Sequence, residues 1–493
     1  MGPERSHPTG TVDPNPWNTP PVQMTELIHD IDVVGVRGNP ATTPVRTIEF
    51  DSRQVQAGSL FCCIRGAHLD GHHYAAEAVG GGATALLCER FLDLGVTQVC
   101  VRRGAVRPAM AAAASTLNGY PSRSLTMVGV TGTNGKTTVT ALVGSILDHA
   151  GIPTGVIGTL DGARTTPEAP VLQRLLAEHR DGGRRAVAME VSSHGLAEHR
   201  VDSIVFDVAA FTNLSRDHLD HHHTMDEYFE AKAGLFDRAR VAVVNVDDPW
   251  GRRLAGQVDR VPVVEVRRAD AGEITLSAGS SSFRWRDRTV TIPLAGMFNV
   301  ENALMAAAVA ASLGVDTDQI AEGLAGVSPV PGRMEVVSSG PPFSVVVDYA
   351  HTPAALEAAL SAARTMAGGS GRVICLFGCG GDRDQGKRPE MGATASRGSD
   401  VVVVTSDNPR SEDPAQIIDQ VRAGITGPVE VVVEPDRAEA IAAAVAMARS
   451  GDIVVLAGKG HETTQVLADQ VVPFDDGDEA RRALAVRTGG AGR

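Results

Sequence analysis

The amino-acid sequence predicts an α/β protein with three domains. Its 493 residues correspond to about three domains at ~100–200 residues per domain. Short apolar strands alternate with helical segments through most of the chain, which is typical of parallel βαβ units. The 53 glycines suit the many tight turns between such strands and helices. Changes in this pattern place the domain boundaries near residues 108 and 334.

The first 24 residues differ from the rest of the chain. They are polar and rich in proline ("HPTGTVDPNPWNTPP"), and they lack the apolar core of a signal peptide. Because such a segment has little apolar surface to bury, we expect a disordered extension over residues 1–24. A first domain over residues 25–108 follows, with short strands and helices around "RTIEFDSRQVQAGSLFCCIRG".

In the second domain, over residues 109–334, strands and helices alternate. The predicted parallel strands are "SLTMVGVTG", "GVIGTL", "RRAVAMEV", "FDVAAFTN" and "VAVVNVDD". Between residues 273 and 294 apolar residues recur at every second position around polar turns, which predicts an antiparallel excursion. The helix "NVENALMAAAVAASLG" then returns to the α/β pattern.

The third domain, over residues 335–493, is predicted to be a doubly wound parallel sheet. Its strands are "FSVVVDYA", "RVICLFGCG", "DVVVVTSDN", "VEVVVEP" and "DIVVLAGKG", and Asp436 is placed as the N-cap of a helix between two of them. Several strands end in a polar motif: "DYAHTP", "GCGGDRDQGKRP", "SDNPRSE" and "GKGHE". Since ligands of doubly wound sheets bind beyond the carboxyl ends of the strands, we expect these motifs to form one site.

The composition excludes several classes of function. The formal net charge is −14, so a nucleic-acid backbone is not a general partner. No apolar run approaches the ~18 residues needed to span a membrane, so we expect a cytoplasmic protein without membrane insertion. The six cysteines show no zinc-type spacing, and we interpret them as buried, reduced thiols.

A glycine loop lies between a strand and a helix in "VGVTGTNGKTTVTALVGSIL". Gly132 and Gly135 permit tight turns, and backbone N–H groups at the helix start can hold phosphates. Lys136 would reach the terminal phosphates and Thr137 would bind Mg²⁺. The strict phosphate-loop spacing has glycine at position 130, where this chain has Val130. A glycine-rich turn without a ligand is the alternative, which Lys-Thr-Thr at the helix start disfavours.

Two further segments offer metal ligands. "AMEVSSHGL" places Glu190 just past a strand, and "NLSRDHLDHHHTMDEYFEAKAGLF" contains His218 and Lys232. Mg²⁺ prefers oxygen ligands, so Glu190 is a natural ligand and His218 a less usual one. The run of histidines at 221–223 is compatible with a transition metal, but a solvated polar turn is the preferred interpretation. Read alone, Lys232 is an exposed helix lysine.

Together these motifs resemble the Mur ligases. The resemblance is carried by "GTNGKTT", "MEVSSHGL", "DHLD", "EAKAGLF", "PGRME", "DYAHTP" and "GKGHE", in the family's order from about residue 25 to the C-terminus. "SDNPRSE" narrows it to the branch that adds meso-diaminopimelate.

The resemblance implies a fold and a reaction. A small N-terminal α/β domain would bind the UDP part of the substrate, a central P-loop ATPase-like domain would bind ATP, and a Rossmann-like C-terminal domain would receive the amino acid. With ATP and Mg²⁺, the γ-carboxylate of D-glutamate in UDP-N-acetylmuramoyl-L-alanyl-D-glutamate would become an acyl phosphate. The amine of meso-2,6-diaminopimelate would then attack it. We expect a monomeric cytoplasmic ligase of peptidoglycan precursor synthesis, and hence a role in cell shape and division.

The resemblance also implies the site residues. For ATP they are Gly132, Thr133, Asn134, Gly135, Lys136, Thr137, Thr138, Asn299, Asn302, Arg333, Asp348 and His351. The magnesium ligands would be Thr137, Glu190 and His218, and the catalytic residues Lys136, Glu190, His218 and Lys232, the last as a carbamylated lysine. For the UDP substrate they are Phe50, Ser52, Ala67, His68, Leu69, Thr165, Thr166, Ser192, Glu198 and Arg200. For diaminopimelate they are Arg383, Asp407, Asn408, Pro409, Arg410, Gly458 and Glu462.

Two positions depart from the family pattern. Arg164 stands where the family often has asparagine, and Glu198 where glutamine is common. Both bear on the contacts to the peptide of the UDP substrate rather than on the reaction.

The cluster in "SDNPRSEDP" suits a ligand that carries both charges. Arg410 can pair with the distal carboxylate of diaminopimelate, which L-lysine lacks, and Pro409 fixes the turn that presents it. Asp407 and Glu412 add carboxylates nearby. The alternatives are an L-lysine-adding relative, a folylpolyglutamate synthase, and a P-loop binding protein without ligation chemistry. The first leaves Arg410 without a partner, and the last has no need for Lys232.

Overall fold

The computed structural model describes residues 20–66, 69–160, 162, 164–277, 279–338 and 343–490. Over these residues the chain forms two compact units. The first unit consists of residues up to 127 together with 166–187 and 194–205. The second consists of residues 128–165, 188–193 and the remainder from 206 onward.

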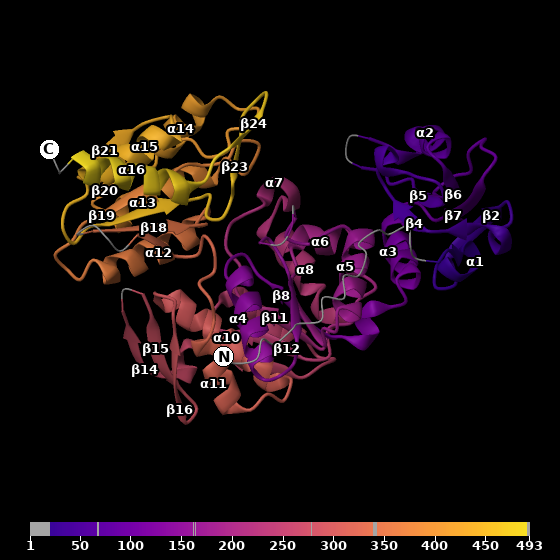
Figure 1. Cartoon of the computed structure of the whole chain (residues 1–493), viewed down its shortest axis with the longest axis horizontal. Coiled ribbons are helices and arrows are strands. Elements are labelled where there is room, and N and C mark those ends of the chain that lie inside the picture. Colours follow the sequence, from indigo (N-terminus) through magenta and orange to yellow (C-terminus); the bar gives the residue numbers. More distant parts are fainter. Residues whose placement is uncertain are drawn as a thin grey trace, which may run out of the picture. The chain divides into compact units, whose positions relative to one another are not determined.

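A five-stranded sheet forms the centre of the first unit (Figure 1). Its order is β2-β7-β6-β5-β4, with β2 antiparallel to β7 and the other pairs parallel. The strands are β2 (Val33–Arg37), β4 (Thr47–Glu49), β5 (Ser59–Cys62), β6 (Ala83–Cys88) and β7 (Thr97–Val101). Alternate strand residues point to opposite faces, so both faces need a cover. Helices α1 (Met24–Leu27) and α3 (Val106–Leu117) share one apolar cluster with the sheet, and α2 (Ala75–Gly80) shares the other.

The first unit begins earlier than the sequence predicts. Strand β1 (Val22–Gln23) pairs with β3 (Pro44–Val45), and the side chain of Met24 is fully buried in the core. The predicted extension over residues 1–24 is therefore wrong for residues 22–24, because these residues have sheet and core partners far along the chain. The other predicted domain boundaries stay predictions.

A six-stranded sheet carries the first half of the second unit. Its order is β13-β12-β11-β8-β10-β9, and the pairs β13-β12, β12-β11 and β11-β8 are parallel, as predicted. The strands are β8 (Thr126–Thr131), β9 (Thr154–Ile157), β10 (Ala186–Glu190), β11 (Val208–Phe211), β12 (Ala242–Asn245) and β13 (Val263–Val266). The helices of the second unit along this stretch are α4 (Lys136–His149), α7 (Leu219–His222), α8 (Met225–Ala233), α9 (Pro249–Gln257), α10 (Met297–Ser312) and α11 (Thr317–Ala325). Helix α5 (Ala169–Asp181) and most of α6 (Ser193–Ala197) belong to the first unit.

The predicted antiparallel excursion is confirmed. Strands β14 (Ala271–Leu276), β15 (Ser281–Trp285) and β16 (Arg288–Ile292) form a separate three-stranded antiparallel sheet. Figure 1 shows it as a distinct ribbon beside α10 and α11. Its inward side chains, Phe283, Val290 and Ile292, are fully buried, in agreement with the period of two in the sequence.

A second six-stranded sheet forms the C-terminal part. Its order is β17-β18-β22-β19-β20-β21, and all pairs except β17-β18 are parallel. The strands are β17 (Glu335–Ser338), β18 (Ser344–Asp348), β19 (Val373–Phe377), β20 (Val401–Val404), β21 (Glu430–Val433) and β22 (Ile453–Ala457). A hairpin of β23 (Thr464–Val466) and β24 (Val471–Pro473) follows.

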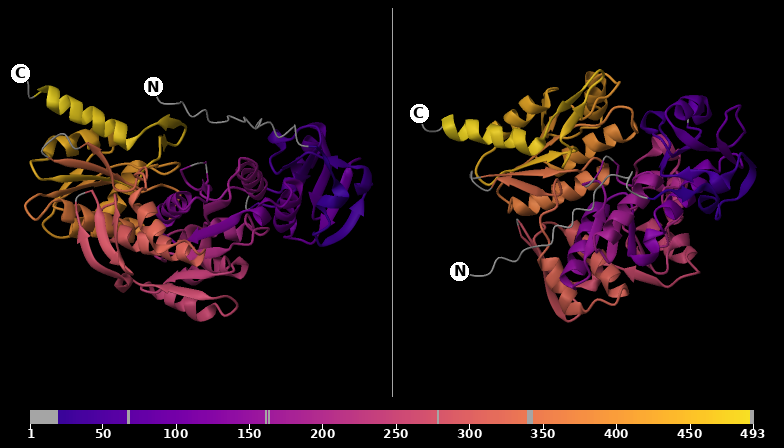
Figure 2. Two further views of the ribbon diagram at one scale, coloured as in Figure 1. Left: turned by 60° about the horizontal axis from the view of Figure 1, so that its bottom comes forward. Right: turned by 45° about the vertical axis from the view of Figure 1, so that its right-hand side comes forward.

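Helices cover both faces of this sheet, which confirms the predicted doubly wound arrangement. One apolar cluster joins Cys375 and Phe377 of β19 to α12 (Pro353–Met366), α13 (Lys387–Gly398) and α14 (Pro414–Arg422). The other joins Ile374 and Leu376 to α15 (Arg437–Met447) and α16 (Asp476–Gly490). Figure 2 shows α16 running along the outer side of the sheet. Strands buried on both faces read as unbroken apolar runs, which explains "VVVV" at β20.

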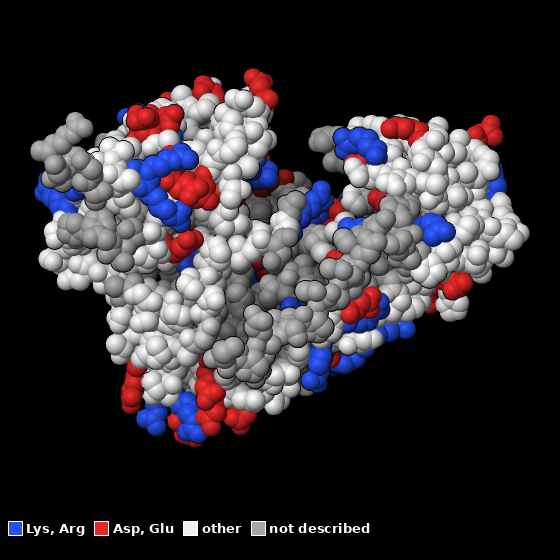
Figure 3. All heavy atoms as spheres, viewed as in Figure 1, with Lys and Arg blue, Asp and Glu red and all other residues white. Residues whose placement is uncertain are grey.

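All six cysteines are buried and free, as predicted. Burial raises the pKa of the Cys375 thiol to about 12, so this side chain is an unreactive core residue at neutral pH. Within the described residues, no helix combines the length and apolarity needed to cross a membrane. On the face shown in Figure 3, acidic and basic side chains are interspersed rather than gathered by sign.

Candidate functional site

The predicted phosphate loop connects β8 to α4 in a conformation that requires glycine. Gly132 has a φ of 146° and Gly135 a φ of 87°. A Cβ atom at Gly132 would lie 1.9 Å from Oγ1 of Thr212, and one at Gly135 would lie 2.5 Å from Oδ1 of Asn302. Any other residue would therefore clash at either position. Without these side chains, a ligand can approach the backbone closely at the start of the helix.

A cavity of about 370 Å³ lies beside this loop in the second unit. The predicted ATP and metal residues that line it are Thr133, Asn134, Gly135, Lys136, Thr137, Thr138, Glu190, His218, Asn302, Arg333, Asp348 and His351. The predicted residues Gly132, Asn299 and Lys232 lie outside its lining. The structure therefore brings together segments from both halves of the second unit around one cavity.

Thr137 and Glu190 form an oxygen-rich corner of the cavity. The Thr137 hydroxyl donates to Oε2 of Glu190 at 3.1 Å, and the backbone N–H of Thr159 donates to Oε1 at 2.9 Å. Arg333 donates from Nη2 to the Thr137 hydroxyl at 2.9 Å. A buried carboxylate and a hydroxyl next to a phosphate loop are the hard donors that Mg²⁺ prefers, so these residues fit that ion.

Lys136 is held inside the loop itself. Its Nζ donates to the carbonyl oxygens of Gly132 at 3.0 Å and Thr133 at 2.9 Å. Burial lowers the pKa of the Lys136 ammonium from its ordinary value, and the charge of Glu190 opposes this. Lys136 also lines the cavity, where an anionic phosphate would replace its carbonyl partners.

Lys232 is a buried residue rather than an exposed helix lysine. It is 1% exposed, and its Nζ donates to the carbonyl of Gly132 at 2.8 Å. The ammonium lies 4.6 Å from the ring centroid of Tyr228. Burial, together with the nearby charge of Lys136, holds the pKa of Lys232 well below its usual range. The surface interpretation of this residue is therefore wrong, because its helix faces the phosphate loop.

Asp217 is a site residue that the motif-by-motif prediction missed. Its carboxylate lies 3.4 Å from Nε2 of both His218 and His351, and 3.2 Å from Nζ of Lys387. Burial alone would raise the pKa of Asp217, but the hydrogen bond with His351 and the charge of Lys387 hold it well below its usual range. The first acid of the motif "DHLD" is the signal that could have found it.

Two of the predicted nucleotide residues act within the protein framework. Asn299 is fully buried and donates from Nδ2 to the Ala295 carbonyl at 2.8 Å. The Asp348 carboxylate accepts from the backbone N–H groups of Met334 at 2.8 Å and Ala350 at 2.9 Å. Burial raises the pKa of Asp348 from its ordinary value. Asp348 therefore joins the segment at Met334 to the end of β18, and it also lines the cavity.

The predicted amino-acid residues meet at the carboxyl edge of the C-terminal sheet. Asn408 follows β20 and Glu462 follows β22, and Nδ2 of Asn408 donates to Oε2 of Glu462 at 2.8 Å. Lys459, which the prediction missed, is fully buried between them. Its Nζ donates to Oδ1 of Asn408 at 3.2 Å and to Oε2 of Glu462 at 3.0 Å. One face of the Glu462 carboxylate is thus fixed by the protein.

Two arginines lie close together at the same edge. Arg410 has a φ of 52° and donates from Nη1 to the Gly381 carbonyl at 2.7 Å. Burial and the charge of Arg383 lower the pKa of Arg410 from its ordinary value. A Cβ atom at Gly380 would lie 2.9 Å from Nη1 of Arg410, so glycine makes room for this side chain. Two guanidinium groups brought together in this way favour an anionic ligand.

The remaining polar residues of this cluster shape its loops. Asp407 is buried, and a Cβ atom at Gly458 would lie 2.7 Å from its Oδ2. Glu412 pairs with the fully buried Arg388 through two bonds of 2.8 Å. Glu412 therefore anchors the turn after Pro409 and is not a ligand group.

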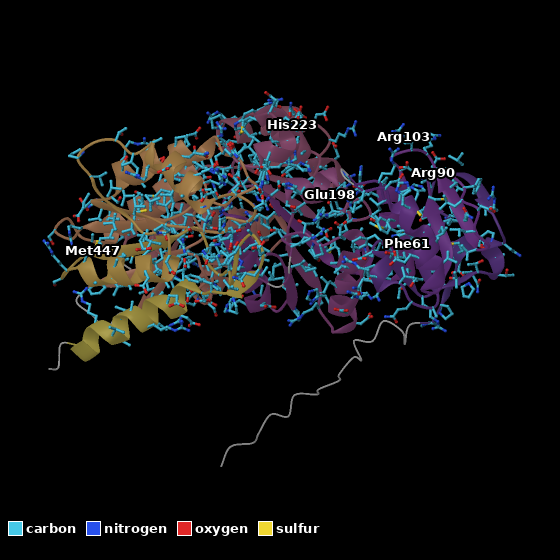
Figure 4. All side chains as sticks on the ribbon, turned by 90° about the horizontal axis from the view of Figure 1, so that it is seen from above. Phe61, Arg90, Arg103, Glu198, His223 and Met447 are labelled. Carbon is cyan, nitrogen blue, oxygen red and sulfur yellow. The ribbon has the colours of Figure 1, made fainter. Side chains whose placement is uncertain are left out.

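Some predicted UDP-substrate residues form a charged cluster in the first unit. Arg200 donates from Nη1 to the Thr166 carbonyl at 2.8 Å and pairs with Glu168 at 2.9 Å. It also pairs with Glu198, one of the two departures from the family pattern, which is labelled in Figure 4. Arg107, 3.1 Å from Glu168, joins the same cluster. Glu168 and Arg107 were missed by the prediction.

The other predicted UDP-substrate residues are more dispersed. Phe50 packs against the core of the first unit, Ser52 begins a short 3-10 helix, and Leu69 is 64% exposed. Thr165 belongs to the second unit, where its Oγ1 lies 3.0 Å from that of Thr159. Ser192 follows β10 in the same unit, and Ala67 and His68 lie outside the described residues.

Solved structures share this fold. The structure of a UDP-N-acetylmuramoyl-L-alanyl-D-glutamate--2,6-diaminopimelate ligase is 32% identical, covers 95% of this chain and 99% of its own, and superposes with a TM-score of 0.64. A MurF from Acinetobacter baumannii, 21% identical, covers 89% of this chain and 95% of its own at a TM-score of 0.66, which reflects the fold alone.

Curated relatives match nearly the whole chain. A protein of Syntrophomonas wolfei is 43% identical over 94% of this chain and 99% of its own length. One of Streptomyces coelicolor is 43% identical over 96% of this chain and 98% of its own length. Both bear the name UDP-N-acetylmuramoyl-L-alanyl-D-glutamate--2,6-diaminopimelate ligase.

Three family models match in succession, which confirms the predicted number of domains. Residues 44–126 match the description "Mur ligase family, catalytic domain", residues 130–310 "Mur ligase middle domain", and residues 332–460 "Mur ligase, glutamate ligase domain". On these matches and on the identity to the relatives, the chain belongs to the Mur ligase family.

Proposed function

We propose that this protein is the ATP-dependent ligase that joins meso-2,6-diaminopimelate to the γ-carboxylate of D-glutamate in UDP-N-acetylmuramoyl-L-alanyl-D-glutamate. The names of relatives 43% identical over nearly the whole chain support this assignment. The observation that carries it is the pairing of a phosphate-loop cavity with a two-arginine edge in one compact unit. The phosphate-loop cavity would activate a carboxylate, and the two-arginine edge would hold a zwitterionic amino acid.

The chemistry begins with phosphoryl transfer. A carboxylate is a poor electrophile, so its oxygen attacks the γ-phosphorus of ATP, and ADP leaves with the electrons of the broken P–O bond. Lys136 and Arg333 neutralise the charge of the transferred group, and the backbone N–H groups after Gly132 hold the phosphates. Thr137 and Glu190, with His218 nearby, would hold Mg²⁺, which would supply further charge neutralisation on the phosphates.

Amide formation follows from the acyl phosphate. The diaminopimelate amine loses a proton and attacks the carbonyl carbon, and the tetrahedral intermediate expels inorganic phosphate. Arg410 and Arg383 bind carboxylates of the amino acid, and Glu462 accepts from its ammonium. The Asn408 amide oxygen already accepts from Lys459 and from the Val466 N–H, so Asn408 acts by holding Glu462 in place. The enzyme contributes positioning of the amine against the acyl carbon, which makes the attack effectively unimolecular.

Lys232 is proposed to be a carbamylated lysine. Its depressed pKa, which burial and Lys136 cause, leaves an uncharged amine available to CO₂. The nitrogen lone pair attacks the carbon of CO₂, a proton leaves, and a carbamate anion forms. This places an anion beside the Lys136 ammonium in place of a neutral amine, so the buried cation gains a partner of opposite charge.

The first unit is proposed to hold the UDP part of the substrate. Phe50, Ser52 and Leu69 would contact the uridine with Ala67 and His68, and Arg200 and Thr166 would contact the sugar and peptide. We propose that the first domain, which begins at Val22 rather than at residue 25, extends to residue 108, and that the other two domains span residues 109–334 and 335–493. We also propose a cytoplasmic monomer of peptidoglycan precursor synthesis with consequences for cell shape and division.

One experiment tests this function. The protein is incubated with ATP, Mg²⁺, the UDP-muramoyl dipeptide and, separately, meso-diaminopimelate, L-lysine or L-ornithine, and the product is weighed by mass spectrometry. We expect an amide product and stoichiometric phosphate only with diaminopimelate. A product with L-lysine instead would assign the lysine-adding activity, and nucleotide binding without any product would leave a P-loop binding protein.

A further inference from the structure

We propose that Arg437 and Asp476 form a buried positioning device behind the amino-acid site, an inference that rests on the proposed function. The two side chains are completely buried. Nε and Nη2 of Arg437 each donate to an Asp476 carboxylate oxygen at 2.7 Å. Arg437 begins α15 and Asp476 begins α16, the two helices on one face of the C-terminal sheet. Neither residue belongs to the site described above.

The same guanidinium also holds two loops of the site. Its Nη1 donates to the Ser406 carbonyl at 3.2 Å, and its Nη2 donates to the Ala457 carbonyl at 3.0 Å. Ser406 directly precedes Asp407 in the loop that carries Arg410. Ala457 is the last residue of β22, just before the loop that carries Glu462. Arg437 therefore hydrogen-bonds to each loop at the residue where the loop leaves the sheet.

The two loops are also joined directly, beyond the ends of their strands. In the sheet, β19 lies between β20 and β22, so these two strands share no backbone ladder. The direct bonds are made further out, from Asn408 to Glu462 and from the Arg410 N–H to the Val466 carbonyl. The loops nevertheless approach closely, since a Cβ atom at Gly458 would lie 2.7 Å from Oδ2 of Asp407. Arg437 therefore adds a second constraint at the base of both loops, where they leave the sheet.

A buried ion pair is weak evidence of a purely stabilising role. Replacing such a pair with well-packed apolar residues is often neutral or stabilising. What an apolar pair could not supply is the two directed hydrogen bonds to loop carbonyls. The bidentate hold of Asp476 fixes the guanidinium plane and with it the direction of both bonds.

The opposite edge of the same sheet provides a matched control. Arg372, directly before β19, donates from Nη2 to Oδ2 of Asp452 at 2.8 Å, and Asp452 directly precedes β22. Nη2 of Arg372 also donates to the Met447 carbonyl at 2.9 Å. This pair has the same chemistry and also joins two segments, but it lies at the amino ends of the strands, away from the site.

The test compares Arg437→Lys with Arg372→Lys in the full-length enzyme. For each variant, kcat, the KM for diaminopimelate, the KM for ATP and the Tm are measured. We expect Arg437→Lys to raise the KM for diaminopimelate by about tenfold or more, as small misplacements of binding groups do, with an unchanged KM for ATP. Arg372→Lys should lower the Tm without changing either KM.

A second variant covers the case in which Arg437→Lys does not fold. Asp476→Asn keeps the arginine and loosens only its orientation, so it should raise the same KM by a smaller factor. An unchanged diaminopimelate KM in the folded Arg437 variant, or in Asp476→Asn where the former does not fold, overturns the proposal. So does an equal KM rise in Arg372→Lys. Failure of the proposed function is a separate result, because the wild-type enzyme would then make no amide product.

Discussion

The Asp217 carboxylate accepts a hydrogen bond from Nζ of Lys387, 3.2 Å away and 170 positions further along the chain. Asp217 lines the cavity together with His218, whereas Lys387 begins α13, which packs on one face of the C-terminal sheet. Since His351 also lies 3.4 Å from the same carboxylate, Asp217 joins three segments of the second unit at the cavity. A carboxylate with three cationic or imidazole partners is the centre of a buried charge network.

Asp217→Asn should lower stability and activity together. Breaking a buried ion pair costs about 3–5 kcal/mol, so we expect a clear fall in the urea midpoint at neutral pH. The folded pKa of Asp217 is depressed, so its charge contributes stability above the unfolded pKa of about 3.9, and this contribution is lost as pH falls through the folded pKa. The difference in unfolding free energy between wild type and Asp217→Asn should therefore become smaller below about pH 4. A difference that stays constant over that range would contradict the charge assignment.

Lys136→Ala should fold normally and lose turnover. Its ammonium faces a cavity rather than a carboxylate partner, so stability should change little. An electrostatic donor to a transition-state charge contributes about 10²–10³ in kcat, and we expect a loss of at least that size. The loss of turnover is measured as the rate of phosphate release, and circular dichroism confirms that the variant is folded. Wild-type turnover would remove Lys136 from the phosphate loop's chemistry.

Arg410→Ala should abolish the preference for diaminopimelate over L-lysine. When L-lysine is bound, the Arg410 guanidinium has no carboxylate to pair with, and this lowers kcat/KM for L-lysine by orders of magnitude. Replacing Arg410 with alanine removes this penalty. The ratio of kcat/KM for the two amino acids is the measurement, and the KM for ATP should stay unchanged. Arg422→Ala, an exposed arginine on α14, is the control and should keep the preference. Equal kcat/KM values in the wild type would contradict the role of Arg410.

The fold could be predicted because its signals are local. The run at residues 401–404 and its neighbours are apolar throughout since both faces of the sheet are covered, and each strand ends where a polar motif begins. The carboxyl-edge site follows from that register, because parallel strands bring their motifs to one edge. Extending the disordered segment to residue 24 failed since the partners of Val22 and Gln23 lie 23 and 21 positions further along the chain, in β3.

The supporting residues of the site could not be predicted, because burial and partners are not local. Lys459 stands in a recognised motif, but nothing in its spacing says that its ammonium lies between Asn408 and Glu462. Glu412 and Asp407 are both carboxylates in the same loop, so the sequence does not distinguish their roles. Only the pairing with Arg388 in the structure shows that Glu412 anchors the loop. Lys232 reads as a surface residue until its helix is packed against the phosphate loop.

The buried position of Lys232 leads to a prediction on CO₂. The chain contains four lysines, Lys136, Lys232, Lys387 and Lys459, and every other basic residue among its 45 is an arginine. Carbon-13 NMR of the protein under labelled CO₂ should therefore show a carbamate signal that is simple to assign. The signal should persist in Lys387→Arg and Lys459→Arg, and it should disappear in Lys232→Met.

Lys232→Ala should fold and be nearly inactive, whereas Glu230→Ala, on the exposed side of the same helix, should keep full activity. A truly exposed lysine would cost at most about 0.5 kcal/mol and no turnover on removal. Removing the carbamate of Lys232 would leave the Lys136 ammonium without a neighbouring negative charge, in a site that must bind and release phosphates. Since a small carboxylate can enter the vacated space, acetate should restore part of the rate in Lys232→Ala and none in Lys136→Ala. Full activity of Lys232→Ala without added acid would mean that the buried amine serves packing alone.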